Sequence, residues 1–257
     1  MNYLTLGAGS LAPISRLLSW IRLPLITEFT VTIDSRPTKD FAFFMADLQI
    51  AGMGHTIRDF NSNHLTYPNT NLSRELDPSL LDLDDLRPCM EFHNLRRMNF
   101  DLQWAVALSD DELLMLASAW PHLEELLINM NLGWNRPEGG ITPNGLALLL
   151  QTCPSLTLVA LALDTRGYTQ SPALQYQGPL SASSFARPFH IDVLDSVIKK
   201  ESVDAIAAFL SSVVPHPDLV LSSWKTRARL WHPDLDLYRE RWGNVHTQAS
   251  EAIRKRQ

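Results

Sequence analysis

The stretch WPHLEELLINM, residues 120–130, contains the pattern that organises the rest of the chain. An apolar run with helical spacing ends at Trp120, a proline follows, and apolar positions then alternate from Leu123 onward. Proline disfavours helical backbone in the residue before it, and alternation is typical of a strand. The stretch therefore predicts a helix that ends at the proline and a strand that begins beside Leu123.

The same phrase recurs along the chain, which indicates an internal repeat. It appears as LPLITEFTVTI (23–33), CPSLTLVALAL (153–163) and HPDLVLSSW (216–224), and without the proline as FHNLRRMNFDL (92–102). The shared leucine or isoleucine is Ile26, Leu95, Leu123, Leu156 or Leu219, with weaker copies expected near Ile57 and residue 189. These positions imply about seven irregular units of roughly 30 residues, the range of known repeat proteins.

Each unit also has a segment with helical periodicity before its strand. In LSDDELLMLASAW, Ser109 and Glu112 have the spacing of a capping box, which predicts that a helix begins there. Thr142 followed by Pro143 predicts the start of the next helix, because proline is tolerated at the first helical position.

These units predict an α/β fold, a leucine-rich-repeat-like solenoid with parallel strands on the concave face and helices on the convex face. We expect this solenoid to occupy residues 1–224, with a long loop at 165–188 that is rich in serine, proline and glutamine. Residues 225–257 carry eight Lys/Arg and four Asp/Glu and are expected to form a basic C-terminal helical cap or tail.

The segments 86–129, 139–167 and 191–210 resemble the repeat regions of the expanded F-box/leucine-rich-repeat-like proteins of mushroom-forming fungi. In that family an N-terminal F-box binds the Skp adaptor of a cullin-RING ubiquitin ligase, and the repeats hold the substrate. The resemblance implies a protein-binding module similar to the substrate-binding arm of such a receptor. This sequence has no F-box phrase, so a Skp-type adaptor is expected as a partner only if an F-box lies upstream.

Alternation places candidate partner-binding residues on the concave side of the strands. Two strand-to-helix loops add aromatic and arginine side chains, which are frequent at protein interfaces. Leu127, Leu158 and Ala160 form either an exposed apolar patch or a surface covered by the 165–188 loop. The candidate residues are Arg97, Asn99, Asp101, Glu125, Leu127, Asn129 and Leu158 on the strands, and Trp134, Arg166 and Tyr168 in the loops.

The amino-acid composition restricts the cellular compartment and the classes of partner that we expect for the protein. Two cysteines, 64 residues apart, make neither a disulfide framework nor a zinc site, and no apolar run of 18 residues could span a membrane. The 24 acidic and 14 basic residues before Lys225 disfavour nucleic-acid binding. We therefore expect a cytoplasmic or nuclear protein whose partner is another protein, with no nucleic acid and no membrane.

No catalytic, metal or cofactor site is expected, and the protein is predicted not to be an enzyme. One alternative is a nucleotide-binding enzyme, because Gly7, Gly9 and Ala12 match a dinucleotide fingerprint and Asp34 ends the next strand. Another is a truncated fragment without independent function, which would expose an uncovered apolar layer at its N-terminal edge.

Overall fold

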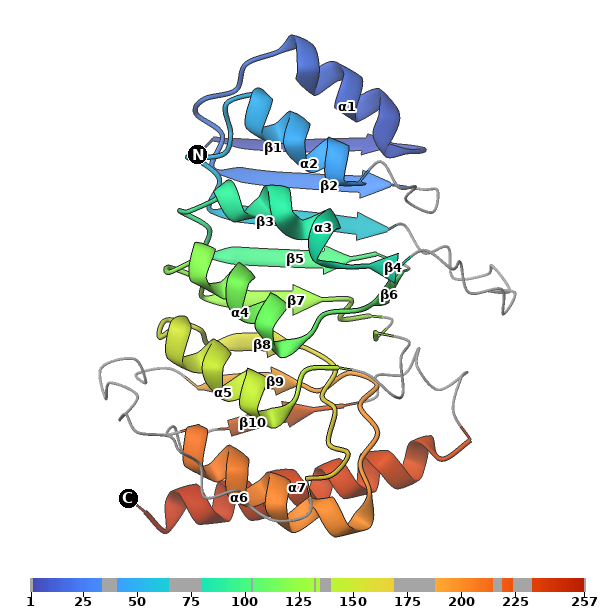
Figure 1. The fold of residues 1–257 in the computed structure, drawn as a ribbon, viewed down its shortest axis with the longest axis vertical. Helices are drawn as coiled ribbons and strands as arrows, with labels where there is room; N and C mark the ends of the chain where they lie inside the picture. The colour runs from blue at the N-terminus through green and yellow to red at the C-terminus, as the bar shows by residue number, and fades with distance from the viewer. Residues whose placement is uncertain are drawn as a thin grey trace.

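Eight short segments of alternating side chains pair into one parallel sheet (Figure 1). Neighbouring strands follow the order of the chain from one edge to the other, without any reversal. The computed structural model describes residues 2–33, 41–64, 80–102, 104–131, 133–134, 140–168, 188–214, 219–223 and 233–256. The strands of this sheet are β1 (Tyr3–Ala8), β2 (Glu28–Ile33), β3 (Asp59–His64), β5 (Arg97–Asp101), β7 (Glu125–Ile128), β8 (Leu158–Ala160), β9 (Phe189–Asp192) and β10 (Leu219–Ser222). A separate two-stranded sheet joins β4 (Leu80–Leu81) to β6 (Ala105–Val106).

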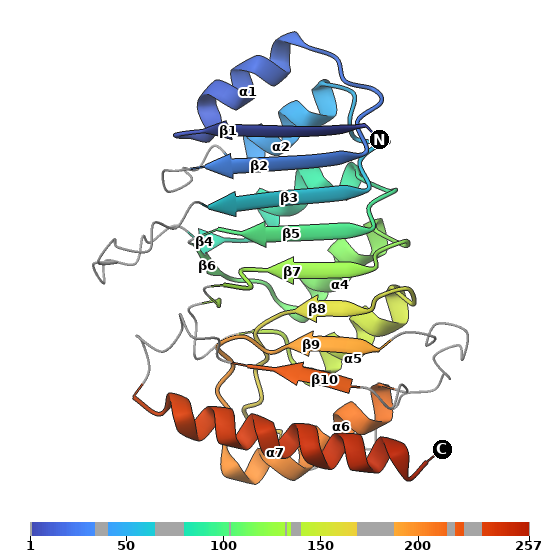
Figure 2. The ribbon, with the colours of Figure 1, turned by 180° about the vertical axis from the view of Figure 1, so that it is seen from behind.

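Helices connect the strands and cover one face of the sheet. They are α1 (Leu11–Trp20), α2 (Phe41–Ile50), α3 (Leu83–Leu86), α4 (Asp110–Ala119), α5 (Pro143–Thr152), α6 (Val203–Val213) and α7 (Leu235–Arg254), with 3-10 turns at Arg87–Glu91 and Lys200–Ser202. Figure 2 shows the opposite side, with α2, α4 and α5 behind the strands, α1 beyond β1, and α7 running alongside β10 in front of α6. The side of the strands that faces away from α1 to α6 is called the open face below.

This architecture corrects the expected leucine-rich-repeat-like solenoid of about seven repeats. The described chain forms an α/β fold on a single eight-stranded parallel sheet, the strand–helix alternation on which Rossmann-like folds are also built. The units are unequal, since successive strands begin between 25 and 38 residues apart and α3 has four residues where α2, α4 and α5 have ten. The recurring proline phrase is a local signal that a helix ends and a strand begins. It predicts that alternation but not a regular repeat.

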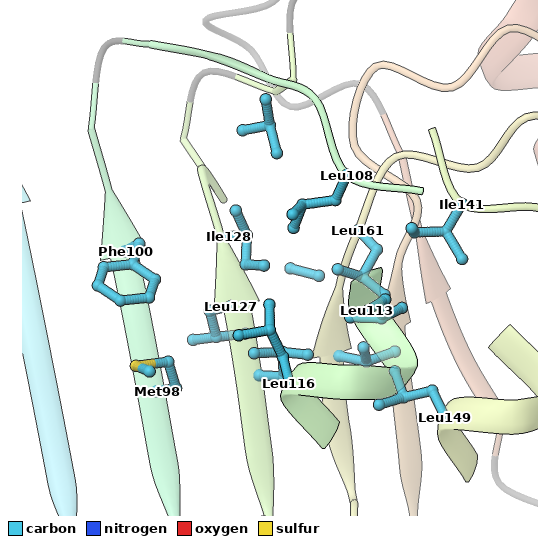
Figure 3. Packing of buried hydrophobic residues seen from close by; sticks show 14 of the residues in the cluster. Met98, Phe100, Leu108, Leu113, Leu116, Leu127, Ile128, Ile141, Leu149 and Leu161 are labelled. Carbon is cyan, nitrogen blue, oxygen red and sulfur yellow. The ribbon is translucent and has the colours of Figure 1, made fainter. Parts of the chain in front are cut away.

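The inward alternation of the strands builds the core (Figure 3). Met98 and Phe100 of β5 are fully buried, and Leu126 and Ile128 of β7 are 1% exposed, as their spacing from Leu95 and Leu123 predicts. Leu113 and Leu116 of α4 and Leu149 of α5 are buried opposite these strands. Burial of a leucine or phenylalanine side chain contributes about 1.5–3 kcal/mol, so these layers dominate the stability of the fold.

The predicted helix starts at Ser109 and Thr142 are confirmed. Ser109 accepts a hydrogen bond from the Glu112 N–H (3.3 Å), and the Ser109 N–H donates to the Glu112 carboxylate (2.8 Å). Thr142 Oγ1 accepts a hydrogen bond from the Gly145 N–H (3.2 Å), with Pro143 in the first turn. These caps satisfy N–H groups that a helix leaves without partners.

The long C-terminal helix α7 packs against α6 and β10. The indole of Trp242 is buried and donates to the carbonyl oxygen of Ser196 (2.9 Å), while Nε2 of His246 hydrogen-bonds to the carbonyl oxygen of Leu219 (2.8 Å). The basic segment predicted for residues 225–257 thus contains a helix that covers the β10 end of the sheet. Most of the predicted 165–188 loop, residues 169–187, lies outside the described residues.

Candidate functional site

Side chains on the open face lie in straight rows, because all the strands pair in register. The first row joins Glu28 of β2, Asp59 of β3, Arg97 of β5 and Glu125 of β7, each directly opposite the next. This charged row crosses the middle of the sheet. Parallel strands lie about 4.8 Å apart, so each side chain is within reach of its neighbours.

Arg97 is the one cation of this row. Its Nε donates to Asp59 Oδ1 at 2.9 Å, and about half of its side chain remains exposed. Partial burial by itself would lower the pKa of the guanidinium, but the charge and hydrogen bond of Asp59, with the charges of Glu125 and Glu124, together raise it. Arg97 therefore stays charged and is held between carboxylates on both neighbouring strands.

A second row, parallel to the first, carries uncharged hydrogen-bonding groups. Thr30 of β2, Asn61 of β3 and Asn99 of β5 are paired in register and are all partly exposed. The Oδ1 atom of Asn99 is shielded from solvent and has no hydrogen-bond partner among the described residues. A buried acceptor without a partner is costly, so Asn99 contributes less to stability here than a fully hydrogen-bonded amide would.

The third row ends at Asp101, whose carboxylate is held in place by hydrogen bonds. Thr32, Asn63 and Asp101 continue the open face toward the carboxyl ends of β2, β3 and β5. Asp101 accepts from the backbone N–H of Asn131 (3.3 Å) and from its side-chain amide. Across β2, β3, β5 and β7, the open face thus carries four carboxylates (Glu28, Asp59, Asp101 and Glu125) and the single guanidinium of Arg97.

The apolar residues of the predicted site are less exposed to solvent than expected. Leu127 is only 9% exposed and Ala160 is fully buried, while Leu158 is partly buried. These three residues therefore do not form an exposed apolar patch. Of the predicted strand residues, Arg97, Asn99, Asp101, Glu125 and Leu158 remain accessible to a partner.

Asn129 and Trp134 are structural residues, which corrects their assignment to a partner-binding surface. Asn129 has a left-handed backbone (φ 55°) and is fully buried. Its side chain accepts from the Leu102 N–H (2.9 Å) and donates to the Trp104 carbonyl oxygen (2.7 Å). Trp134 is also fully buried, and its indole donates to the Ile128 carbonyl oxygen (3.0 Å).

The other predicted loop residues lie apart from the charged row. Arg166 is exposed and is bound to the carboxylate of Asp164 through two hydrogen bonds of 2.9 and 2.8 Å. Tyr168 packs edge-on against Phe209 of α6, so it belongs to the helix side of the sheet. Neither residue extends the open face of β2 to β7.

Asp59, Asn61 and Asn63 are site residues that the sequence did not identify. The strand that carries them, DFNSNH, follows Ile57 without the proline phrase, and its inward positions include a serine. The alternation of polar residues at 59, 61 and 63 was the available signal. It was weak because the intervening positions are not uniformly apolar.

The described residues offer little reactive chemistry. They contain no group of three or more His, Cys, Asp or Glu side chains arranged to hold a metal ion. Burial raises the pKa of the Cys153 thiol to about 12 and raises that of Cys89 further, so neither is a thiolate near neutral pH. The site's chemistry is therefore that of charge pairing and hydrogen bonding.

Comparisons with known proteins leave the family open. No protein-family model matches the chain, and no curated protein sequence is significantly similar to it. None of the helices in the described parts of the chain is long and apolar enough to cross a membrane.

Proposed function

We propose that this protein is a non-enzymatic protein-binding module that holds its partner on the open face of β2, β3, β5 and β7. The observation that carries the proposal is the charged row of Glu28, Asp59, Arg97 and Glu125, aligned in register on a face that α1 to α6 leave uncovered. Side chains fixed on neighbouring strands lose little entropy when a partner binds, which favours recognition by a preformed surface.

The charge of this face indicates the chemistry of the partner. The face carries four carboxylates and one guanidinium, that of Arg97, which is already bound to Asp59. A protein segment that carries lysine or arginine would complement the free carboxylates, and its amide or hydroxyl donors would meet Asn61 and Asn99. Charge complementarity of this kind contributes specificity and the rate of association more than affinity.

By analogy with the F-box proteins that the sequence resembles, this module would be the arm of a ubiquitin-ligase receptor that holds the substrate. That assignment is part of the proposal and depends on an F-box supplied upstream. It predicts that a Skp-type adaptor and a cullin are recovered together with the bound protein only when such a segment is present.

Charge reversal on the open face tests the proposal. The chain is used as bait in an extract of its source, beside the variants Arg97→Glu and Glu125→Lys, and retained proteins are identified by mass spectrometry. The control is Arg87→Glu, because Arg87 is exposed to a similar extent and also binds a carboxylate, Asp84, but lies on the helix side. We expect the same partner to bind the wild type and the control and to be lost from Glu125→Lys, whereas Arg97→Glu, which adds negative charge to the face, should bind a basic partner more strongly.

Two outcomes would overturn the proposal. One is a partner retained equally by all four baits, which would place binding elsewhere. The other is that no protein is retained specifically by the wild type. Circular dichroism of each bait shows whether a lost partner reflects a changed surface or an unfolded chain.

The alternative of a nucleotide-binding enzyme has no geometric support at its glycines. An added Cβ at Gly9 would meet no atom within 4 Å, and at Gly7 the nearest atom is 3.9 Å away. Neither glycine has a positive φ. The strand order also has no reversal, which is where open α/β sheets bind nucleotides. Asp34 lies outside the described residues.

A further inference from the structure

We propose that the partner of the open face carries its basic and its apolar side chains in separate segments, and that Leu158, His190 and Val220 bind the apolar segment. These three residues are called the apolar end here. The inference rests on the proposed function, because it specifies the partner of the same face. It extends the binding surface from the charged row to β8, β9 and β10.

The apolar end continues the charged row across the remaining strands. Glu125 of β7 lies directly opposite Leu158 of β8. Leu158 in turn lies opposite His190 of β9, and His190 lies opposite Val220 of β10. These side chains therefore project from the open face, because residues paired in register lie on the same side of a sheet. From Glu28 to Val220 this line of side chains spans roughly 29 Å, at about 4.8 Å per strand.

The residues of the apolar end are accessible to a partner. Val220 is 42% exposed, His190 is exposed and Leu158 is partly exposed. The preceding residues on β9 and β10, Phe189 and Leu219, are buried and belong to the core. An imidazole has an apolar body with a polar tip, so in line with an exposed valine and leucine it forms a surface of low polarity next to the charged row.

The accessible part of the open face narrows toward the apolar end. On β5, residues of all three rows are accessible, whereas the second row is buried on the strands that follow. Leu127 of β7 is 9% exposed, Ala160 of β8 is fully buried and Asp192 of β9 is 3% exposed. Of the open-face residues on β8 and β9, Leu158 and His190 are therefore the accessible ones. A partner that reaches these strands is confined to the first row.

The first row ends where the sheet meets α7. β10 is the last strand of the sheet, and α7 runs alongside it (Figure 2). Nε2 of His246 on α7 hydrogen-bonds to the carbonyl oxygen of Leu219, the residue before Val220 (2.8 Å). The helix therefore holds the strand that carries Val220, and the line of binding side chains has a defined last position.

Charge complementarity determines what the partner carries over each part of the row. The charged row has three carboxylates and one guanidinium, that of Arg97, which is bound to Asp59, so a lysine or arginine is attracted there. A charged side chain over Leu158, His190 and Val220 would leave water near neutral pH without an opposite charge beneath it, which is unfavourable. An apolar side chain would be stabilised by burial there. A partner with basic and apolar residues intermixed would match neither part fully.

Three synthetic peptides of equal length test this inference by calorimetric titration of the full chain. The first has lysines in one half and leucines in the other, in a glutamine background, and is made in both directions so that the tighter binder is used. The second contains the same residues with lysines and leucines intermixed, and the third has glutamate in place of each lysine of the first. We expect the first peptide to bind about tenfold more tightly than the second, and the third not to bind.

Variants of the chain assign the effect to the apolar end. Val220→Thr and Leu158→Asn replace an apolar side chain by a neutral one, so each should weaken the first peptide about threefold to tenfold, equally at low and high salt. Glu125→Gln removes a charge and should weaken it at low salt much more than at high salt. The control is Met115→Gln, because Met115 of α4 lies on the helix side and is 44% exposed, close to the 42% of Val220. It should bind like the wild type.

The possible outcomes separate this inference from the proposed function. If the first and second peptides bind equally, or if Val220→Thr and Leu158→Asn bind the first peptide as tightly as Met115→Gln does, the apolar end takes no part in binding. This inference is then wrong, while the proposed function stands. If the glutamate peptide binds as tightly as the lysine peptides, or if none of the three binds, the open face does not select a basic partner and both are overturned.

Discussion

Asp110 in the first turn of α4 holds the N-terminus of the next helix, α5, through Thr142. The Thr142 N–H donates to Asp110 Oδ1 (2.9 Å), and the Thr142 hydroxyl donates to the other carboxylate oxygen. Thr142 Oγ1 in turn accepts from the Gly145 N–H. The Asp110 carboxylate therefore fixes the position of the N-terminus of α5 relative to that of α4. It also stabilises α4, because a negative charge near a helix N-terminus interacts favourably with the helix dipole.

Gly145→Ala should disrupt this link. A Cβ at residue 145 would overlap Asp110 Oδ1 and would lie 2.8 Å from Ile141 Cγ2, so the Asp110 side chain would have to move. Overpacking costs about 1–3 kcal/mol and loss of a cap about 1 kcal/mol more. We expect the free energy of unfolding, from urea denaturation, to fall by about 2–4 kcal/mol.

Gly9→Ala is the control for that measurement, because a Cβ at residue 9 meets nothing within 4 Å. Its free energy of unfolding should change by less than about 0.5 kcal/mol. Equal effects of the two substitutions would contradict the role assigned to the Asp110 contact.

Asn129→Ala, at the residue that follows β7, should be among the most destabilising single substitutions at the ends of the strands. It removes the acceptor of the Leu102 N–H and the donor to the Trp104 carbonyl oxygen, both buried, and places alanine at a left-handed φ of 55°. Each buried group left unsatisfied costs about 1–3 kcal/mol, and the strained backbone adds about 1 kcal/mol. Thermal unfolding should show a large fall in Tm.

Asn131→Ala, two residues along the chain, provides the comparison. Asn131 is exposed and its amide binds Asp101 at the surface. We expect its Tm to stay within a few degrees of the wild type. An Asn129→Ala variant as stable as Asn131→Ala would show that Asn129 does not hold the Leu102 and Trp104 backbone.

Gly243→Ala should stabilise the protein. Gly243 lies in the exposed middle of α7, without a positive φ, and a Cβ there meets no atom within 4 Å. Replacing glycine by alanine in a helix interior contributes about 0.5–1 kcal/mol. A higher midpoint in urea with an unchanged slope is the expected result, and a lower midpoint would mean that α7 does not pack as described.

The cysteines should make stability fall at alkaline pH. Burial raises the pKa of Cys153 to about 12 from 9.0, and raises that of Cys89 as well. Above about pH 9 an unfolded thiol loses its proton while the folded thiol keeps it, so the unfolded state binds fewer protons and is favoured as pH rises. The stabilisation is complete below pH 9 and is lost between there and the folded pKa.

Thiol titration checks this prediction directly. With a disulfide reagent near pH 8, the native protein should react slowly and the unfolded protein should react at both cysteines. The double variant Cys89→Ser, Cys153→Ser should lose the part of the alkaline destabilisation that comes from the thiols. Rapid reaction of the native protein would contradict the burial of Cys89 and Cys153.

Local patterns in the sequence predicted local structure well. The capping box at Ser109 and Glu112 and the alternation after Leu123 report contacts between residues a few positions apart. The architecture was not predicted correctly, because the proline phrase marks a helix-to-strand transition wherever it occurs and does not require equal units. Asn129 was misplaced for a related reason. Strict alternation puts it on the open face, but its left-handed backbone turns the side chain into the loop.

Because the strands pair in register, the charged side chains of the open face are evenly spaced. They repeat at the strand spacing, about 4.8 Å, so the four residues from Glu28 to Glu125 span roughly 14 Å. An extended peptide laid across the strands advances about 3.3 Å per residue and soon falls out of step with this repeat. A helix advances about 5.4 Å per turn, which is closer to it. The surface is therefore better matched to a partner that offers one side chain per helical turn.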